Sequence, residues 1–486
     1  MQDTEKFMSA LSSTDVQGQF ESFNAKDYPS IDGEISHCNK LIMHAAKISL
    51  VTLKKKWKNT KKSKPWYDNT CRQLKKQLQH LAKKINPTTH RSLQKEWFAL
   101  KKKYKKQVKL MHKKYKNDLM NEINALSSEH SQDVWRQINK LQKESTVEEE
   151  TLISPEAWIQ HFRQYNNETN VNTSFANDSD ETENLSDDEI LGKPITPKEI
   201  HEHISKLKTK KASSMDSILN EMIKHGRYFL LPSLEKIFND ILNSCKFPTE
   251  WNIGVIKPIY KREGDRRSPA NQITLTSCLG KLFTSILQSR LNKYIEIHNI
   301  LNPEQFGFRP NARTTDSLFI LQQLLYKYTK QHEKLYVGFI DYEKAFDSVW
   351  QSGMIHKLQK EGIKGKFLKV IKSMYSSIRS CEMVNQNTMT ESSLCNKGMR
   401  QEDGLSPVLF SLFMTDLPEY FRVHNCPGVK SGNQSLNCLM YADDLLVISN
   451  SPEGLQQSLN VIQKHAQEWK LKEKKKKSNI IIFSGN

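Results

Sequence analysis

Apolar and polar residues alternate along this chain with two different periods. Between residues 51 and 143, apolar side chains recur at steps of three and four, as at Leu100, Tyr104, Val108 and Met111. That spacing predicts amphipathic helices. From Ile195 onward, short apolar runs alternate with longer helical patterns. The second pattern predicts an α+β domain in which an antiparallel sheet carries helices on one face.

Individual elements can be placed from these patterns. Thr196-Pro-Lys-Glu199 opens a helix as a capping box, with Thr at the N-cap, Pro at N1 and Glu at N3. We predict strands at residues 255–260, 335–340, 438–441, 445–448 and 479–483, and helices at residues 279–298, 352–375, 406–417 and 454–469.

Two adjacent carboxylates, Asp443 and Asp444, lie between the predicted strands of a hairpin. Asp341 follows another buried strand. Like charges beside buried strands are unfavourable unless a cation lies between them, and a divalent metal is the simplest such cation. Two alternatives remain for these residues taken singly: Asp341 could cap a helix at residues 342–346, and Asp443-Asp444 could form an ordinary turn.

Charge divides the chain further. Residues 54–118 contain 23 Lys and Arg against three acids, whereas residues 144–189 contain 13 acids and one Arg. Excess positive charge favours a polyanion such as nucleic acid, although a solvated charged helix is the alternative. We expect a poorly structured N-terminal remnant at residues 1–50, a basic helical linker at residues 51–143, an acidic disordered linker at residues 144–192 and the α+β domain at residues 193–486.

Other sequence features narrow the class of protein. No apolar run approaches the roughly 20 residues that span a bilayer, and the N-terminus lacks the pattern of a signal peptide. Eight cysteines are scattered without a C-x-x-C pair, which argues against a disulfide framework or a zinc knuckle. We therefore expect an intracellular protein with no membrane partner, in the nucleus, the cytoplasm or both.

Seven sequence motifs then bring out a family resemblance. They include Gln305-Phe-Gly-Phe-Arg-Pro310, residues 339–347 (Phe-Ile-Asp-Tyr-Glu-Lys-Ala-Phe-Asp), residues 398–407 and Tyr441-Ala-Asp-Asp444. In this order they resemble the reverse transcriptase of non-LTR, LINE-type retrotransposons, and in particular the jockey-like group. The resemblance implies the fingers and palm of a right-hand polymerase, with the basic linker as an arm before them. It also implies a truncated copy that ends before the thumb.

The resemblance assigns roles to individual residues. Asp341, Asp443 and Asp444 would hold two Mg²⁺ ions, with Mn²⁺ as a substitute, and Lys477 would assist the departure of pyrophosphate. Phe346 would be the steric gate that excludes a 2′-hydroxyl. The remaining substrate-binding residues would be Lys261, Arg400, Gln401 and Tyr441, and the nucleic-acid contacts of the arm would include Lys101, Lys102, Lys103, Lys105 and Lys106.

The sequence also departs from the family pattern. An arginine that grips the triphosphate is expected after Asn271, but Gln272-Ile273 follow directly. Glu402 stands where the family has glycine. A negative side chain there would oppose a polyphosphate. Residues 1–50 are too few to form the endonuclease that usually precedes the linker, so an element-encoded endonuclease or partner chain would have to supply one.

The sequence therefore predicts an RNA-directed DNA polymerase, a nucleotidyltransferase of a transposable element. Its partners would be an RNA template, a DNA primer and deoxynucleoside triphosphates. One alternative is a nucleic-acid-binding remnant that has lost turnover, as the missing arginine and Glu402 suggest. An RNA-dependent RNA polymerase is a third reading, disfavoured by Phe346 and by Tyr441-Ala442.

Overall fold

The structure is a computed structural model of the 486-residue chain. It describes residues 2–49, 66–85, 91–125, 188–258, 272–385, 388–389, 391–431, 434–474 and 477–484. The chain divides into two compact units, one formed by residues 1–51 and 153–486 and the other by residues 52–152. The predicted acidic linker at residues 144–192 lies outside the described residues up to position 187.

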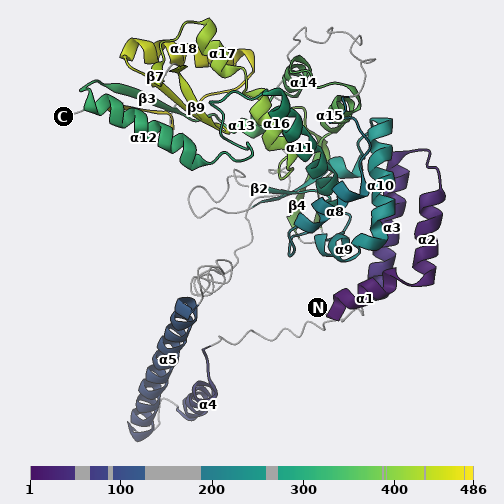
Figure 1. The fold of residues 1–486 in the computed structure, drawn as a ribbon. Coiled ribbons are helices and arrows are strands. Elements are labelled where there is room, and N and C mark those ends of the chain that lie inside the picture. Colours follow the sequence, from purple (N-terminus) through teal and green to yellow (C-terminus); the bar gives the residue numbers. More distant parts are fainter. Residues whose placement is uncertain are drawn as a thin grey trace. The chain divides into compact units, whose positions relative to one another are not determined.

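The helices and strands are labelled in chain order (Figure 1). The helices are α1 (Gln2–Leu11), α2 (Thr14–Ala25), α3 (Ile31–Ser49), α4 (Asn69–Lys84), α5 (Arg91–Ala125), α8 (Pro197–Lys206), α9 (Asn220–His225), α10 (Arg227–Ser244), η5 (Glu250–Asn252), α11 (Cys278–His298), α12 (Thr314–Lys330), α13 (Ala345–Ser348), α14 (Gln351–Lys360), α15 (Gly365–Ser376), α16 (Leu405–Phe413), α17 (Leu417–Val423) and α18 (Pro452–Glu468). The strands are β1 (Ile253–Pro258), β2 (Gln272–Leu275), β3 (Leu335–Ile340), β4 (Arg379–Asn385), β5 (Thr388–Met389), β6 (Ser393–Leu394), β7 (Val429–Ser431), β8 (Gln434–Leu436), β9 (Cys438–Tyr441), β10 (Asp444–Ser449) and β11 (Asn479–Phe483).

The smaller unit contains two basic helices that pack on each other, α4 and α5. Asp68 caps α4, because its side chain accepts a hydrogen bond of 2.7 Å from the Cys71 amide. The hydroxyl groups of Tyr67 and Tyr104 lie 2.8 Å apart and join the two helices. The helical periodicity of this segment therefore predicted the secondary structure of its described part.

The first 49 residues differ from the expected poorly structured segment. They form α1, α2 and α3, and the last two of these helices pack against α10 (Figure 1). Apolar side chains at helical spacing are fully buried there, including Phe23, Ile35 and Ile42. At the same interface, the Lys236 ammonium lies 2.8 Å from the buried Glu34 carboxylate. Residues 2–49 are thus a layer of the main core.

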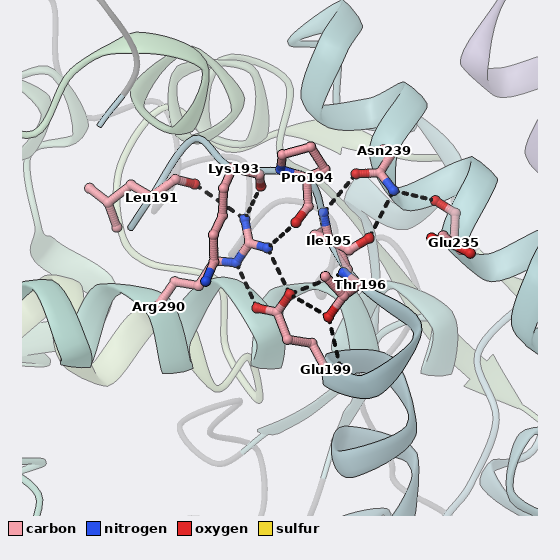
Figure 2. Close-up of polar contacts among 9 residues, drawn as sticks. All are labelled: Leu191, Lys193, Pro194, Ile195, Thr196, Glu199, Glu235, Asn239 and Arg290. Atoms are coloured by element: carbon pink, nitrogen blue, oxygen red, sulfur yellow. Dashed lines mark hydrogen bonds and ion pairs between the residues drawn. The ribbon is translucent and has the colours of Figure 1, made fainter. Parts of the chain in front are cut away.

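Hydrogen bonds centred on Arg290 of α11 fix residues 191–199, at the start of the described part of the main domain (Figure 2). The guanidinium donates to both oxygens of Glu199, at 3.0 and 2.9 Å, and to the Lys193 and Pro194 carbonyls. The Thr196–Glu199 capping box forms as predicted. Arg290 is only 4% exposed, so these contacts join the start of α8 to α11 inside the protein.

The central four-stranded sheet has the order β11-β3-β10-β9 and is antiparallel throughout. The expectation of helices on one face is wrong, because α12 covers one face and α18 the other (Figure 1). Leu335 and Val337 of β3 pack in the α12 cluster. Gly338 faces Leu455 of α18. A strand that is apolar at nearly every position fits a sheet with two covered faces.

A second sheet has the order β2-β1-β4-β5, with β6 beside β4. β1 pairs antiparallel with β2 and parallel with β4. The single helix predicted at residues 352–375 is instead two helices, α14 and α15. Gly362 lies between them with a φ of +80°, and Gly365, the first residue of α15, has a φ of +66°, so the helix is interrupted here.

Two further sequence predictions concern cysteines and membranes. All eight cysteines lie in the described residues, and no two of them form a disulfide. No helix among the described residues combines the length and apolarity needed to cross a bilayer.

Candidate active site

Three carboxylates come together at one end of the central sheet. Asp341 directly follows β3, while Asp443 lies in the two-residue turn between β9 and β10 and Asp444 begins β10. The pairing of Leu445 with Ile340 places Asp444 across from Asp341, and neighbouring strands are about 5 Å apart. Asp341 does not cap a helix, because the next helix, α13, starts at Ala345.

The surroundings of Asp443 shift the pKa of its carboxyl group. Burial raises the pKa of the Asp443 carboxyl, and the nearby negative charges of Asp444 and Asp341 raise it further. The described residues nevertheless contain no group of three His, Cys, Asp or Glu side chains already gathered as metal ligands. The raised pKa of Asp443 and the absence of a gathered ligand set in the described part of the chain are both consistent with three carboxylates that repel one another. Their hard oxygen atoms suit Mg²⁺ or Mn²⁺, and a cation here would relieve the repulsion.

The basic segment before β11 lies along the backbone of Asp341. The Lys474 amide donates to the Asp341 carbonyl at 2.7 Å, and the Asp341 amide donates to the Ser478 hydroxyl at 3.3 Å. Lys477 lies within this segment and its side chain is exposed. The structure therefore brings the neighbourhood of Lys477 to the carboxylates, although its ammonium has no described contact with them.

Phe346, the predicted steric gate, is half-buried in an aromatic group. Its ring stacks on Phe410 of α16 with centroids 4.4 Å apart, and it meets Phe308 edge to face at 6.1 Å. Such packing restricts the ring to one position. Tyr441, also half-buried, pairs with Asp444 across the turn.

Gln401 is held at both ends of its side-chain amide. Its nitrogen donates to an Asp347 carboxylate oxygen at 2.7 Å, and its oxygen accepts from the Thr274 hydroxyl at 2.9 Å. Burial raises the pKa of the Asp347 carboxyl, against the lowering effects of Gln401, Lys344 and Lys397. Asp347 was not among the predicted site residues, and the signal for it was its place at the end of the motif 339–347.

A pocket opens beside this set of hydrogen bonds. Its lining includes Thr274, Asp347 and Gln401 together with the basic residues Arg379 and Lys397. The pocket therefore lies between β2 of the second sheet and the loop before α16. Its lining is largely apolar, and the basic side chains of Arg379 and Lys397 are the part of it that would suit a phosphate group.

Comparisons with known proteins decide the family. A family model described as reverse transcriptase (RNA-dependent DNA polymerase) matches residues 261–482. Residues 261–482 belong to the reverse transcriptase family. The predicted resemblance to LINE-type elements is confirmed by relatives such as "Probable RNA-directed DNA polymerase from transposon BS" of Drosophila melanogaster, which is 30% identical over 290 residues.

A second relative supports the same placement of the reverse transcriptase domain. "RNA-directed DNA polymerase from mobile element jockey" of Drosophila funebris is 28% identical over 287 residues. The alignments cover 58% and 57% of this chain but only 31% and 30% of the two relatives. The chain thus spans about a third of the length of these relatives. Among solved structures, apo telomerase from Candida Tropicalis covers 54% of this chain and 62% of its own at 13% identity, with a TM-score of 0.38.

Arg400 of the reverse transcriptase domain, predicted to bind substrate, makes several hydrogen bonds within the protein. Its side chain is 6% exposed, and its guanidinium donates to Asp403 at 3.1 Å, to the Trp251 carbonyl at 2.8 Å and to Asn252. These contacts join the loop before α16 to the start of β1. Arg400 therefore stabilises the support of Gln401, and it also contributes to the lining of the pocket. Its role in substrate binding stays a prediction. Lys261 lies outside the described residues.

Glu402 has a backbone conformation that explains why glycine is expected at this position. Its φ is +61°, in the left-handed region, and its side chain is exposed. We expect Glu402→Gly to raise the free energy of unfolding by about 1 kcal/mol, because glycine adopts this φ without a steric penalty. Thermal and urea melts of the two proteins would measure the change.

Glu402→Gln is the matched control, since it removes the charge and keeps the unfavourable φ. Equal stabilisation by Glu402→Gln and Glu402→Gly would mean that charge, and not backbone conformation, makes Glu402 unfavourable.

The same pair of variants tests nucleotide use. If the negative charge opposes the triphosphate, both variants should lower the KM for deoxynucleoside triphosphates.

Proposed function

We propose that this chain is an RNA-directed DNA polymerase that extends a primer 3′-hydroxyl along an RNA template with deoxynucleoside triphosphates. The observation that carries the proposal is the pairing of β3 with β10, which brings Asp341 beside Asp443 and Asp444. Two bound Mg²⁺ ions, or Mn²⁺ in their place, would lower the pKa of the primer hydroxyl and stabilise the leaving pyrophosphate.

Other residues of the chain have parts in this proposal. Phe346 would exclude ribonucleotides, because its packed ring would collide with a 2′-hydroxyl. Gln401 would contact the incoming nucleotide and template from a fixed amide orientation. Lys477 would approach the pyrophosphate from the segment beside Asp341. Each of these roles follows from the family and is supported by the position of the residue.

Primer extension on an RNA template tests the proposal. The full chain is incubated with an annealed DNA primer, Mg²⁺ and deoxynucleoside triphosphates, and the product length is measured. We expect extension that requires the divalent cation and that fails in Asp341→Asn. Extension with ribonucleotides alone, or extension that Asp341→Asn leaves unchanged, would contradict the proposal.

A catalytically impaired nucleic-acid-binding protein is the second candidate. The left-handed Glu402, where the family has glycine, and the arginine missing after Asn271 favour it. This candidate predicts tight binding of the primer and template without any product, even at high concentrations of enzyme and nucleotide. The same primer-extension experiment, with binding measured in parallel, therefore distinguishes the two functions.

The basic arm is proposed to bind the nucleic-acid partner. Four of the five predicted lysines are exposed on α5, and Lys101 lies over the Trp97 ring at 4.2 Å. We expect replacement of Lys101, Lys102, Lys103, Lys105 and Lys106 by Gln to weaken RNA binding about tenfold or more at low salt, and to reduce the dependence of affinity on salt. Fluorescence anisotropy with labelled RNA at several salt concentrations measures both.

Five exposed lysines in the main domain provide the control. These are Lys198, Lys206, Lys208, Lys210 and Lys211. Their replacement by Gln changes the net charge by the same amount. Equal loss of affinity in the two variants would show that overall charge, and not the arm, governs binding.

A further inference from the structure

The motif Gln305-Phe-Gly-Phe-Arg-Pro310 has no part in the proposed function as described so far. In the structure its beginning lies against the strand that leads into the catalytic turn. The Met440 amide donates to the Glu304 carbonyl at 2.8 Å, and the Phe306 amide donates to the Met440 carbonyl at 2.9 Å. Gln305 itself forms a parallel β-bridge with Met440. Residues 304–307 are therefore an extra piece of strand beside β9.

The Gln305 side chain reaches the turn itself. It is 1% exposed, and its oxygen accepts hydrogen bonds from the Ala442 amide at 3.2 Å and from the Gly307 amide at 2.8 Å. Ala442 lies between Tyr441 and Asp443 and has a φ of +61°. Alanine adopts this left-handed conformation at a free-energy cost, so contacts around it must maintain it.

Gly307 shows how closely the segment approaches the turn. A Cβ atom at position 307 would overlap the backbone nitrogen of Ala442 and lie 2.8 Å from the carbonyl carbon of Tyr441. Only glycine allows this approach. The Ser411 hydroxyl of α16 also donates to the Gly307 carbonyl at 3.3 Å, which fixes the segment from its other side.

The environment of the Gln305 amide nitrogen indicates that this residue does more than stabilise the fold. It is buried and has no hydrogen-bond acceptor in the part of the chain that the structure describes. A buried donor without a partner is unfavourable, and a methionine would fill similar space without it. The amide oxygen is thus the group that this position requires.

We propose that Gln305 is a positioning residue, whose amide oxygen holds Ala442 in the left-handed conformation that presents Asp443 beside Asp341. The inference rests on the proposed polymerase function, since it assigns a purpose to the geometry of that same site. Gln305 touches neither substrate nor metal in this account. It acts only through the backbone of the catalytic turn.

The test compares Gln305→Met with the unchanged chain in two measurements. In primer extension with Mg²⁺, we expect kcat to fall roughly 10- to 100-fold while the KM for nucleotide stays within about twofold, because a misplaced carboxylate affects turnover more than nucleotide binding. In hydrogen exchange followed by mass spectrometry, peptides that contain residues 441–444 should exchange about tenfold faster. Gln322→Met, on the exposed side of α12, is the control and should change neither.

A second variant separates positioning from general disruption. Adding Ala442→Gly to Gln305→Met should recover about fivefold of the lost kcat, because glycine adopts the left-handed conformation without support. Unchanged exchange and unchanged kcat in Gln305→Met would overturn the proposal, as would an absence of recovery in the double variant. If the unchanged chain makes no product but Gln305→Met still accelerates exchange at residues 441–444, the positioning role stands and the polymerase function fails.

Discussion

Asp443→Asn should abolish primer extension and make the metal-free protein more stable. We expect product formation to fall at least about 1,000-fold, because an amide cannot replace a carboxylate between two cations. We also expect the melting temperature at pH 7 to rise by about 2 °C. The reason is that burial and the charges of Asp444 and Asp341 disfavour the ionised form of Asp443 in the folded protein.

The dependence of this stability gain on pH follows from the raised pKa. In the folded protein the pKa of Asp443 lies above its ordinary value of 3.8, so ionisation lowers the free energy of unfolding as the pH rises through that interval. The advantage of Asp443→Asn should therefore be full at pH 7 and should shrink as the pH falls toward 4. Thermal melts at several pH values measure the difference between the two proteins.

Divalent cations provide a further comparison in the same melts. Mg²⁺ or Mn²⁺ should raise the melting temperature of the unchanged chain and have little effect on Asp443→Asn, because ligands that bind only the folded state stabilise it. Asp15→Asn, on the exposed face of α2, is the control and should behave like the unchanged chain. A lower melting temperature for Asp443→Asn, or retained extension, would contradict the predicted role of this carboxylate.

Arg290→Met should destabilise the main domain by about 3 kcal/mol or more, which corresponds to roughly 10 °C in melting temperature. The substitution removes the donors for both Glu199 oxygens and for the Lys193 and Pro194 carbonyls (Figure 2). Glu199 Oε2 keeps its hydrogen bonds from Thr196, but Glu199 Oε1 and the two carbonyls lose their Arg290 donors, which is the costly outcome for buried polar groups. Urea denaturation followed by circular dichroism measures the free energy of unfolding.

The pKa of Glu199 gives this prediction a second observable. Burial tends to raise it, but the contacts with Arg290 and Thr196 prevail and the pKa is lowered. The stabilisation from this carboxylate is present above its unfolded pKa and is lost as the pH falls through the folded value. The difference between Arg290→Met and the unchanged chain should therefore narrow in acid below about pH 4.5.

Arg422→Met is the matched control for Arg290→Met. Its side chain is 48% exposed and pairs with the exposed Glu419 and with Glu304, which is 12% exposed. Exposed ion pairs contribute at most about 1 kcal/mol, so this substitution should have a small effect. If Arg290→Met and Arg422→Met lowered the free energy of unfolding by similar amounts, the argument from burial would be refuted.

Much of the main domain could be predicted from sequence because its strands and helices carry strong patterns. β3, β9 and β10 are short apolar runs bounded by polar residues, and the carboxylates stand where these runs end. The periodicity of α11 and α18 gave their positions to within a few residues. These features depend on local sequence alone, which is why they were accessible.

The features that the sequence did not reveal depend on partners far along the chain. The apolar patch at residues 41–43 belongs to α3, which packs on α10 about 200 residues later. Arg400 and Gln401 are neighbours, yet the Arg400 guanidinium donates to the Trp251 carbonyl, whereas the Gln401 amide contacts Asp347 and Thr274. Which way a side chain points in such a loop is set by the backbone, including the left-handed Glu402, and no periodicity encodes it.

The N-terminal layer bears on where a minimal catalytic fragment could start. Asp32 of α3 accepts hydrogen bonds from the Thr249 amide at 2.7 Å and from its hydroxyl at 2.9 Å, just before β1. A fragment cut at residue 261, where the family match begins, would keep all three carboxylates. It would lack β1, which joins β2 to β4, and would expose the apolar side of α11 to water. Efforts to shorten the protein for crystallisation should therefore keep residues 2–49 and 188–258.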